Sequence, residues 1–230
     1  MRVVAFFATL GLIGVAMPAL AQEQPASDPR GFVSASGGFV SALGDKTSDF
    51  RFETGVRVAP HLMVFGNVGR FGDLHVDLQP QIDAATSSLA ANDSLDVNGT
   101  ATVPAWYGTG GLRYSVPVRG PVSPYVLGGI GFARLSPTAQ FTFNGGVLPD
   151  GSTPTPGADV TSAIEAGGLF ANPPASTQLM WTTGGGALIG MGPHLALDAG
   201  YRYSRINADT TLNTSAFNAN GLTFGVGYRF

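Results

Sequence analysis

The side chains best suited to acid–base or metal chemistry are the three histidines of the chain, and one of them stands among carboxylates. In the segment GDLHVD, His75 lies between Asp73 and Asp77. An extended chain would place these three side chains on one face, and a histidine beside a carboxylate is a familiar general base. The pattern is short, however, and a polar loop is the simpler interpretation. We therefore expect no catalytic residue here and predict that the protein is not an enzyme.

The other two histidines belong to a weak internal repeat. The segments VAPHLMVFGNVGRF and MGPHLALDAGYRYS each begin with a Pro-His-Leu turn, which contains His61 in the first and His194 in the second. No carboxylate or third ligand recurs beside them at the spacing of a metal site. The sequence predicts two turn histidines, no metal ion and no cofactor.

The arginines and carboxylates, by contrast, follow a strict period of two. In FRFETGVRV, Phe50 and Phe52 alternate with Arg51 and Glu53, and the segments 195–204 and 221–230 alternate in the same way. Such alternation predicts β-strands with one apolar and one polar face. The polar faces are rich in glycine and arginine, and Lys46 is the only lysine of the chain. That composition is unlike a soluble surface.

A transmembrane β-barrel explains these faces, because its apolar side chains face lipid and its polar side chains face the lumen. The sequence therefore predicts an all-β fold, a transmembrane antiparallel up-and-down barrel of eight strands. The expected strands are residues 31–42, 49–59, 62–71, 104–116, 123–135, 177–190, 195–207 and 219–230. For the first, fifth and sixth of them, glycine and alanine leave the inward face undecided.

The connections between these strands alternate in length. Three tight turns at 58–62, 116–122 and 190–195 contain proline, which suits a turn and cannot donate to a strand ladder. The other connections are 43–48, 72–103, 136–176 and 208–218, and two of them far exceed the usual length of about 4–6 residues. Short periplasmic turns and long outer loops are typical of outer-membrane barrels.

The polar faces supply a predicted charge network in the lumen. An eight-stranded barrel is just wide enough for side chains to fill it, and buried charges must pair or cost several kcal/mol each. Arginines outnumber carboxylates in the network, so water or a further carboxylate must complete it. We expect a plugged polar lumen whose charges come from Arg51, Glu53, Arg57, Arg113, Asp198, Arg202 and Arg229.

The long loops contain further patterns. Residues 74–79, 94–103 and 138–146 continue the alternation, which predicts a sheet that protrudes beyond the membrane. Residues 79–93 favour a short helix, and 148–159 a flexible tip. Rings near strand ends predict an aromatic girdle at the headgroup level. Its expected members are Trp106, Tyr107, Tyr125, Trp181, Tyr201, Tyr203, Tyr228 and Phe230.

The N-terminus has the layout of a secretory signal peptide. Arg2 precedes an apolar run, and Ala19-Leu20-Ala21 forms an A-x-A cleavage site. We expect a signal peptide over 1–21, a short periplasmic leader over 22–30 and a barrel domain over 31–230. Cysteine is absent, only 12% of residues are charged and the formal net charge is −3. A basic nucleic-acid-binding surface is therefore excluded.

The last residues carry a family resemblance. The segment TFGVGYRF, through Thr223, Gly225, Tyr228 and Phe230, resembles the C-terminal assembly signal of bacterial outer-membrane proteins. The whole segment 31–230 resembles the small eight-stranded OmpA/OmpX-like outer-membrane barrels, and we expect no peptidoglycan-binding domain after it. The resemblance implies recognition of the last strand by the barrel-assembly machinery and a location in the outer membrane of Gram-negative bacteria.

Together these observations predict a monomeric barrel with a structural or surface-interaction role. Its expected partners are outer-membrane lipid and lipopolysaccharide, the assembly machinery during insertion, and a surface protein bound through the outer loops. The alternatives are a lipid-modifying enzyme, since some barrels of this kind modify lipid A, and a small-solute pore. A soluble lipocalin-like carrier would need polar outer faces on the strands, and the strands show the reverse.

Overall fold

A computed structural model describes residues 30–42, 44–74, 78–118, 120–208 and 215–230. The expected signal peptide and its cleavage residues, Ala19 and Ala21, lie outside the described residues. The elements in chain order are β1 (Gly31–Ala42), β2 (Asp45–Ala59), β3 (Leu62–Asp73), α1 (Gln79–Asp93), β4 (Asp96–Thr102), β5 (Pro104–Ser115), β6 (Val122–Leu135), β7 (Thr138–Gly145), α2 (Thr161–Ala166), β8 (Ser176–Gly190), β9 (Leu195–Ile206) and β10 (Phe217–Arg229).

Eight of the strands close into an antiparallel barrel in the order β1-β10-β9-β8-β6-β5-β3-β2. Closure joins the first strand to the last, from Phe32 opposite Arg229 to Ala42 opposite Ala219. Beyond that ladder, Gly31 N donates to Phe230 O at 2.9 Å and Phe230 N donates to Gly31 O at 3.0 Å. The predicted eight-stranded barrel is confirmed. Neither helix of the described chain is long and apolar enough to cross a membrane.

The strand boundaries differ from the prediction mainly at β2. We expected a connection over 43–48, but β2 begins at Asp45 and pairs with β1 from Asp45 to Val56. The alternation in fact extends upstream, because Thr47 and Asp49 are buried on the same face as Arg51. β1 ends at Ala42, and Gly44, just before β2, has a φ of 103°, which glycine adopts at no steric cost.

The two faces of the barrel are assigned as expected for a membrane protein. Phe52 is 68% exposed and Phe224 is 63% exposed, whereas Arg51 is 3% exposed. The structure also decides the strands whose faces the sequence left open. Phe32 of β1, Tyr125 of β6 and Met180 of β8 are buried in the lumen.

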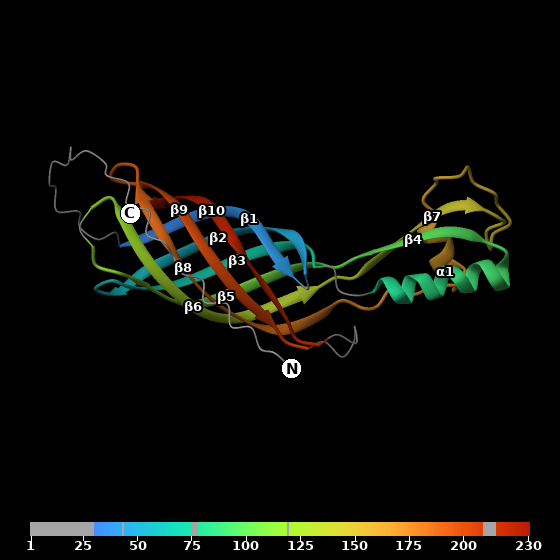
Figure 1. The fold of residues 1–230 in the computed structure, drawn as a ribbon, viewed down its shortest axis with the longest axis horizontal. Helices are drawn as coiled ribbons and strands as arrows, with labels where there is room; N and C mark the ends of the chain where they lie inside the picture. The colour runs from blue at the N-terminus through green and yellow to red at the C-terminus, as the bar shows by residue number, and fades with distance from the viewer. Residues whose placement is uncertain (1–29, 43, 75–77, 119, 209–214) are drawn as a thin grey trace, which may run out of the picture.

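A separate folded unit stands beyond the outer end of the barrel, and we call residues 78–102 and 137–175 the outer module. Figure 1 shows it at the end of the molecule away from the C-terminus, joined to the barrel through a narrow neck. The expected helix is confirmed as α1, which has a proline in its first turn. We also expected the middle strands to protrude as a sheet, and the segments 94–103 and 138–146 do form the paired strands β4 and β7, but these do not continue the barrel sheet. β4 and β7 pair only with each other, and Pro104 and Pro137, which cannot donate to a ladder, lie at the break.

The outer module has its own hydrophobic core. Phe141 and Ile164 are fully buried, and the rings of Phe141 and Phe170 meet edge to face with centroids 5.1 Å apart. α1 crosses β4 at Gly99, where a Cβ atom would lie 2.2 Å from Ile82. The expected tip at 148–159 packs back along β7, since Phe143 N donates to Ala158 O at 2.9 Å. The module is therefore a small domain built from two loops.

This core yields a stability prediction for the outer module alone. Phe141→Ala should destabilise the module by about 3–5 kcal/mol, the usual cost of emptying a fully buried phenylalanine site. Limited proteolysis of intact cells should then cleave within 137–175, while the barrel remains heat-modifiable on a gel. Gln140→Ala, at the exposed neighbouring position of β7, is the control and should leave the loop resistant. If Phe141→Ala lost heat-modifiability, the barrel and the outer module could not have independent cores.

Candidate functional site

Glu53 of β2 is the centre of an ionic cluster in the middle of the lumen. Arg202 of β9 donates to Glu53 Oε2, and Arg113 Nη2 of β5 lies 3.2 Å from Glu53 Oε1. Arg113 Nη2 also lies 3.4 Å from Asp198 Oδ2 on β9. The side chains of Glu53 and Arg113 are 2% and 0% exposed. One buried carboxylate therefore bridges two cations from strands that are not neighbours in the barrel.

Aromatic rings enclose the Arg113 guanidinium. Its Cζ atom lies 3.9 Å from the ring centroid of Tyr125 and 4.7 Å from that of Phe32. Tyr125 in turn donates its hydroxyl to Asp198 Oδ1 at 2.8 Å. Arg113 Nε and Nη1 are buried with no hydrogen-bond partner among the described residues. Cation–π attraction to the two rings thus stabilises the guanidinium where its Nε and Nη1 atoms form no hydrogen bond.

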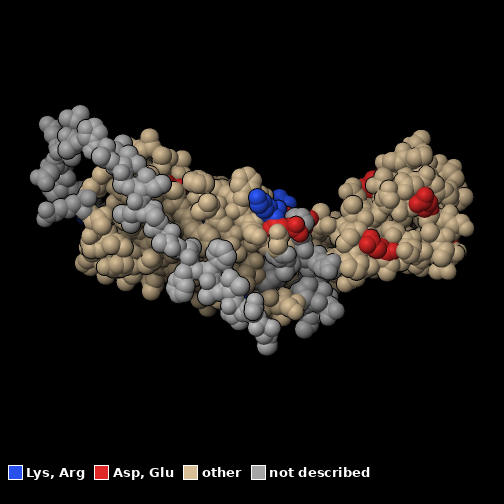
Figure 2. Space-filling view, viewed as in Figure 1, with Lys and Arg blue, Asp and Glu red and all other residues tan. Residues whose placement is uncertain are grey.

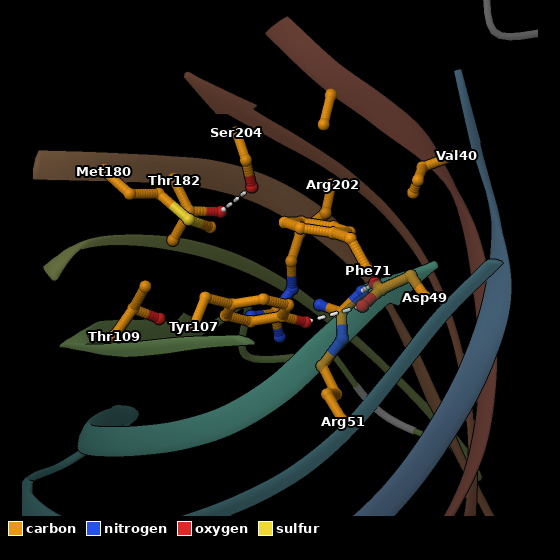
Figure 3. A pocket seen from close by; sticks show the side chains of 11 residues that line it. Val40, Asp49, Arg51, Phe71, Tyr107, Thr109, Met180, Thr182, Arg202 and Ser204 are labelled. Carbon is orange, nitrogen blue, oxygen red and sulfur yellow. Dashed lines mark hydrogen bonds and ion pairs between the residues drawn. The ribbon is translucent and has the colours of Figure 1, made fainter. Parts of the chain in front are cut away.

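A second ion pair lies nearer the outer end, where Arg51 donates to Asp49 on the same strand. Tyr107 of β5 donates its hydroxyl to Asp49 Oδ1 at 2.6 Å, as Figure 3 shows. The cavity beside these groups holds only about 10 Å³. A volume of that size accommodates roughly one water molecule.

Apolar side chains seal the lumen on both sides of these charges. Toward the outer end, Phe71, Leu74 and Leu135 belong to one continuous buried cluster. Toward the periplasmic end, Phe32, Phe65 and Tyr125 belong to another. The expectation of a plugged polar lumen therefore described only its middle layer, because the inward positions near the outer end are apolar.

The structure brings together most of the predicted lumen charges. Five of the seven meet in the two ionic groups, namely Arg51, Glu53, Arg113, Asp198 and Arg202. The other two lie at the periplasmic mouth, where Arg57 and Arg229 line a cavity of about 70 Å³ with His61. Arg229 Nη2 donates to the carbonyl oxygens of Gly192 and Leu195.

The carboxylate that the sequence left unnamed is Asp49, which is 1% exposed. Asp49 lies on the same alternating face of β2 as Arg51 and Glu53, and that alternation was sufficient to find it. Asn67 and Thr109 were missed as well. Thr109 Oγ1 donates to Asn67 Oδ1 at 2.9 Å, and Asn67 Nδ2 lies 3.5 Å from Glu53 Oε2. Uncharged side chains complete the shell around Glu53, and no charge pattern reveals them.

Two rings assigned to the aromatic girdle are placed elsewhere. Tyr107 and Tyr125 are 6% and 5% exposed and face the lumen, so their assignment to the girdle is wrong. The glycines opposite explain how such rings fit. A Cβ atom on Gly69 would lie 2.4 Å from the Tyr107 ring, and one on Gly55 would lie 2.4 Å from Phe32. Of the other predicted girdle members, Trp106, Trp181, Tyr201, Tyr228 and Phe230 are exposed, and Tyr203 is half-buried on the same face of β9 as Tyr201.

The candidate chemical residues do not form a reaction centre within the described part of the chain. His75 and Asp77 lie outside it, and Asp73 Oδ1 accepts a hydrogen bond from Val103 N at 2.9 Å. His194 Nδ1 lies 3.0 Å from Arg229 O, and its ring stacks on Tyr228. No group of three potential metal ligands occurs among the described residues.

The expected assembly signal lies along the strand that closes the barrel. Thr223 faces the lumen, and Tyr228 faces outward. A Cβ atom on Gly225 would lie 2.6 Å from Ala35 O of the neighbouring strand, so the close approach of β1 and β10 requires glycine there. Recognition of this strand by an assembly machinery stays a prediction.

The outer module carries a second concentration of charge, and all of it is negative. Its residues include no lysine or arginine, and its acidic side chains are exposed (Figure 2). The Thr161 backbone N–H and hydroxyl lower the pKa of Asp159, and the Ser152 hydroxyl lowers the pKa of Asp150. These carboxylates therefore stay ionised at neutral pH. The acidic residues of the module are Asp83, Asp93, Asp96, Asp150, Asp159 and Glu165.

The bridging position of Glu53 yields a second prediction. Glu53→Gln should lower the free energy of unfolding by about 3–5 kcal/mol, because Arg113 and Arg202 lose their shared counter-charge in a buried site. Urea unfolding in lipid vesicles measures the change. Glu165→Gln, at an exposed position on α2, is the control and should shift stability by less than about 1 kcal/mol. An equally small shift for Glu53→Gln would argue against a bridge.

Comparison with known proteins places this architecture. A search of curated protein sequences found no significant match. The fold is similar to that of Neisserial surface protein A, with 18% identity, a TM-score of 0.54 and coverage of 87% of this chain and 97% of that one. It is also similar to a major outer membrane protein from Thermus thermophilus, with 14% identity, a TM-score of 0.50 and coverage of 87% and 99%.

A family profile decides the assignment. The profile of the outer membrane protein beta-barrel domain matches residues 7–230, which includes every strand of the barrel and the whole outer module. The chain therefore belongs to the outer membrane protein beta-barrel domain family, and its place is the bacterial outer membrane.

Proposed function

We propose that the protein is a closed outer-membrane anchor that presents the outer module to a partner at the cell surface. The observation that carries this proposal is the module's own hydrophobic core. Leu95, Phe141 and Ile164 are fully buried in it, and none of them belongs to the lumen clusters. Barrel closure needs only a short outer connection, so a folded domain at this position supports a role of its own.

The filling of the lumen supports an anchor rather than a pore. An ionic layer lies between two apolar layers, and the cavity beside Asp49 and Arg51 holds about 10 Å³. Barrels with an open aqueous channel have about 16 strands or more, whereas this one has eight. In this proposal the protein acts as a monomer, since β1 and β10 form backbone hydrogen bonds with each other and leave no open barrel edge.

The two edges of the module's sheet differ, and the difference indicates where a partner binds. Along the outer edge of β7, the N–H groups of Ala139, Phe141 and Phe143 donate to Asn172 Oδ1, Thr161 Oγ1 and Ala158 O. These groups point away from β4. Antiparallel pairing then directs the N–H groups of the facing residues, Gly99 and Ala101, away from β7 as well.

That second edge, along β4, is the open one. Between Val97 and Ala101, its one hydrogen bond within the described chain runs from Gln79 Nε2 to Gly99 O at 3.1 Å. An unpaired edge can accept an extended segment as an additional strand. Since the surrounding surface is acidic, the favoured partner is an extended segment with basic side chains.

A module deletion tests the proposal. Residues 75–102 and 137–175 are replaced by short Gly-Ser linkers, because Leu74 N already donates to Val103 O and Ser136 N to Pro104 O. Cells displaying the full chain should bind an alternating Lys-Thr peptide, and cells displaying the deleted barrel should not. The deleted barrel should remain heat-modifiable and in the outer membrane. A Glu-Thr peptide controls for non-specific adhesion.

A point variant separates strand addition from simple charge attraction. Ala101→Pro removes an edge N–H that β7 does not use, so the sheet should persist while peptide binding falls at least about tenfold. Thr100→Ala, on the exposed polar face, should leave binding unchanged. Equal binding by both variants would argue against the β4 edge. Ion conductance of the full chain in planar bilayers would instead support a pore, and an altered lipid A mass would support an enzyme.

A further inference from the structure

The basic side chains of the barrel strands form two groups, one that faces the lumen and one that faces outward near the outer end of the barrel. Those that face the lumen are Arg51, Arg57, Arg113, Arg202 and Arg229. Those that face outward are Lys46, Arg70, Arg134 and Arg205, and each lies within three residues of the outer end of its strand. Among the described strand residues, no basic side chain faces outward at the periplasmic end.

Two of the outward arginines flank a tryptophan on neighbouring strands. The register pairs Arg70 of β3 with Trp106 of β5, and Trp106 with Arg134 of β6. The Cζ atom of Arg70 lies 5.8 Å from the Trp106 ring centroid, and Trp106 is 59% exposed. Because neighbouring strands are about 4.8 Å apart, the two arginine backbones are separated by roughly 10 Å. We call Arg70, Trp106 and Arg134 the rim cluster.

The described residues supply no anion to the rim cluster. Their ion pairs join Asp49 to Arg51, and join Glu53 and Asp198 to Arg113 and Arg202. Neither Arg70 nor Arg134 takes part in them, although both are exposed. Tryptophan at this depth marks the headgroup level. Two guanidinium groups therefore meet the headgroups of the outer leaflet without a counter-charge from the described part of the chain.

We propose that the rim cluster binds the phosphate groups of a phosphorylated glycolipid in the outer leaflet. Guanidinium groups match phosphate oxygens with paired, charge-assisted hydrogen bonds. The occupant is a lipid because both arginines stand on the outward face of membrane-spanning strands, beside exposed apolar positions such as Val68 and Phe132. The acidic outer module emerges from these same strands and repels phosphate, so attraction is confined to the rim. This inference does not depend on the function proposed for the module.

The other outward cations provide matched controls. Arg205 stands at the same level on β9, but its Nη1 donates to Asn218 Oδ1 at 3.4 Å. The facing residue Trp181 packs on Tyr203, with ring centroids 5.3 Å apart. Arg205→Gln therefore removes one rim charge whose donor is already engaged. Lys46→Gln removes a charge on the β1–β2 hairpin, away from Trp106.

The test measures lipid retention by the full-length protein. Wild type, the double variant Arg70→Gln/Arg134→Gln, Arg205→Gln and Lys46→Gln are placed in phosphatidylcholine nanodiscs with lipid A or with dephosphorylated lipid A. Heat-modifiability first verifies the fold of each. Native mass spectrometry then counts the lipid A retained. We expect wild type and both controls to retain lipid A, and the double variant to retain at least about tenfold less.

Further arms make the inference falsifiable. Wild type should retain as little dephosphorylated lipid A as the double variant retains of lipid A itself. Free inorganic phosphate should not displace lipid A at equal concentration. Arg70→Lys/Arg134→Lys keeps the charge without the paired donors and should retain an intermediate amount. Retention that is equal in wild type and the double variant, or equal with and without lipid phosphates, would overturn the proposal. If the double variant does not fold, Arg134→Gln alone decides by the same measure.

Discussion

The requirement that every backbone N–H and C=O group find a partner inside lipid governs the rest of this structure. An open sheet would leave two edges unpaired, so β10 returns to β1 and closes the barrel. Closure gives each strand one face toward lipid and one toward a lumen too narrow for anything but side chains. The alternation of outward Phe50 and Phe52 with inward Arg51 and Glu53 along β2 is the consequence at the level of single residues.

The narrow lumen then determines what its charges do. With almost no room for water, a carboxylate must lie against a cation, and Glu53 lies against two. Phe32, Tyr107 and Tyr125 occupy space that glycines on facing strands leave free. The apolar clusters on either side keep this ionic layer dry. The lumen is therefore filled by the packing of many side chains rather than by any single charged group.

Charge is also segregated along the axis of the molecule. In the lumen, Arg51, Arg113 and Arg202 pair with carboxylates. The outer rim bears outward cations, and the charged side chains of the outer module are all carboxylates. In Figure 2 the basic side chains of the visible face gather at the outer end of the barrel, with acidic ones beside them, whereas the charged side chains visible on the module are all acidic. An anionic outer leaflet attracts the first and repels the second.

The sequence by itself determined the barrel, its eight strands and most of its lumen charges, because a period of two is a local property that any strand between lipid and lumen must obey. It also predicted α1, whose first turn contains Pro80. Only the tertiary structure decided which partners meet. Asp49 joined Arg51 and Tyr107, two girdle tyrosines turned inward, and β4 left the barrel to pair with β7. These features depend on contacts between residues far apart in the chain, and neither periodicity nor composition records which side chains will meet across the lumen or between the outer loops.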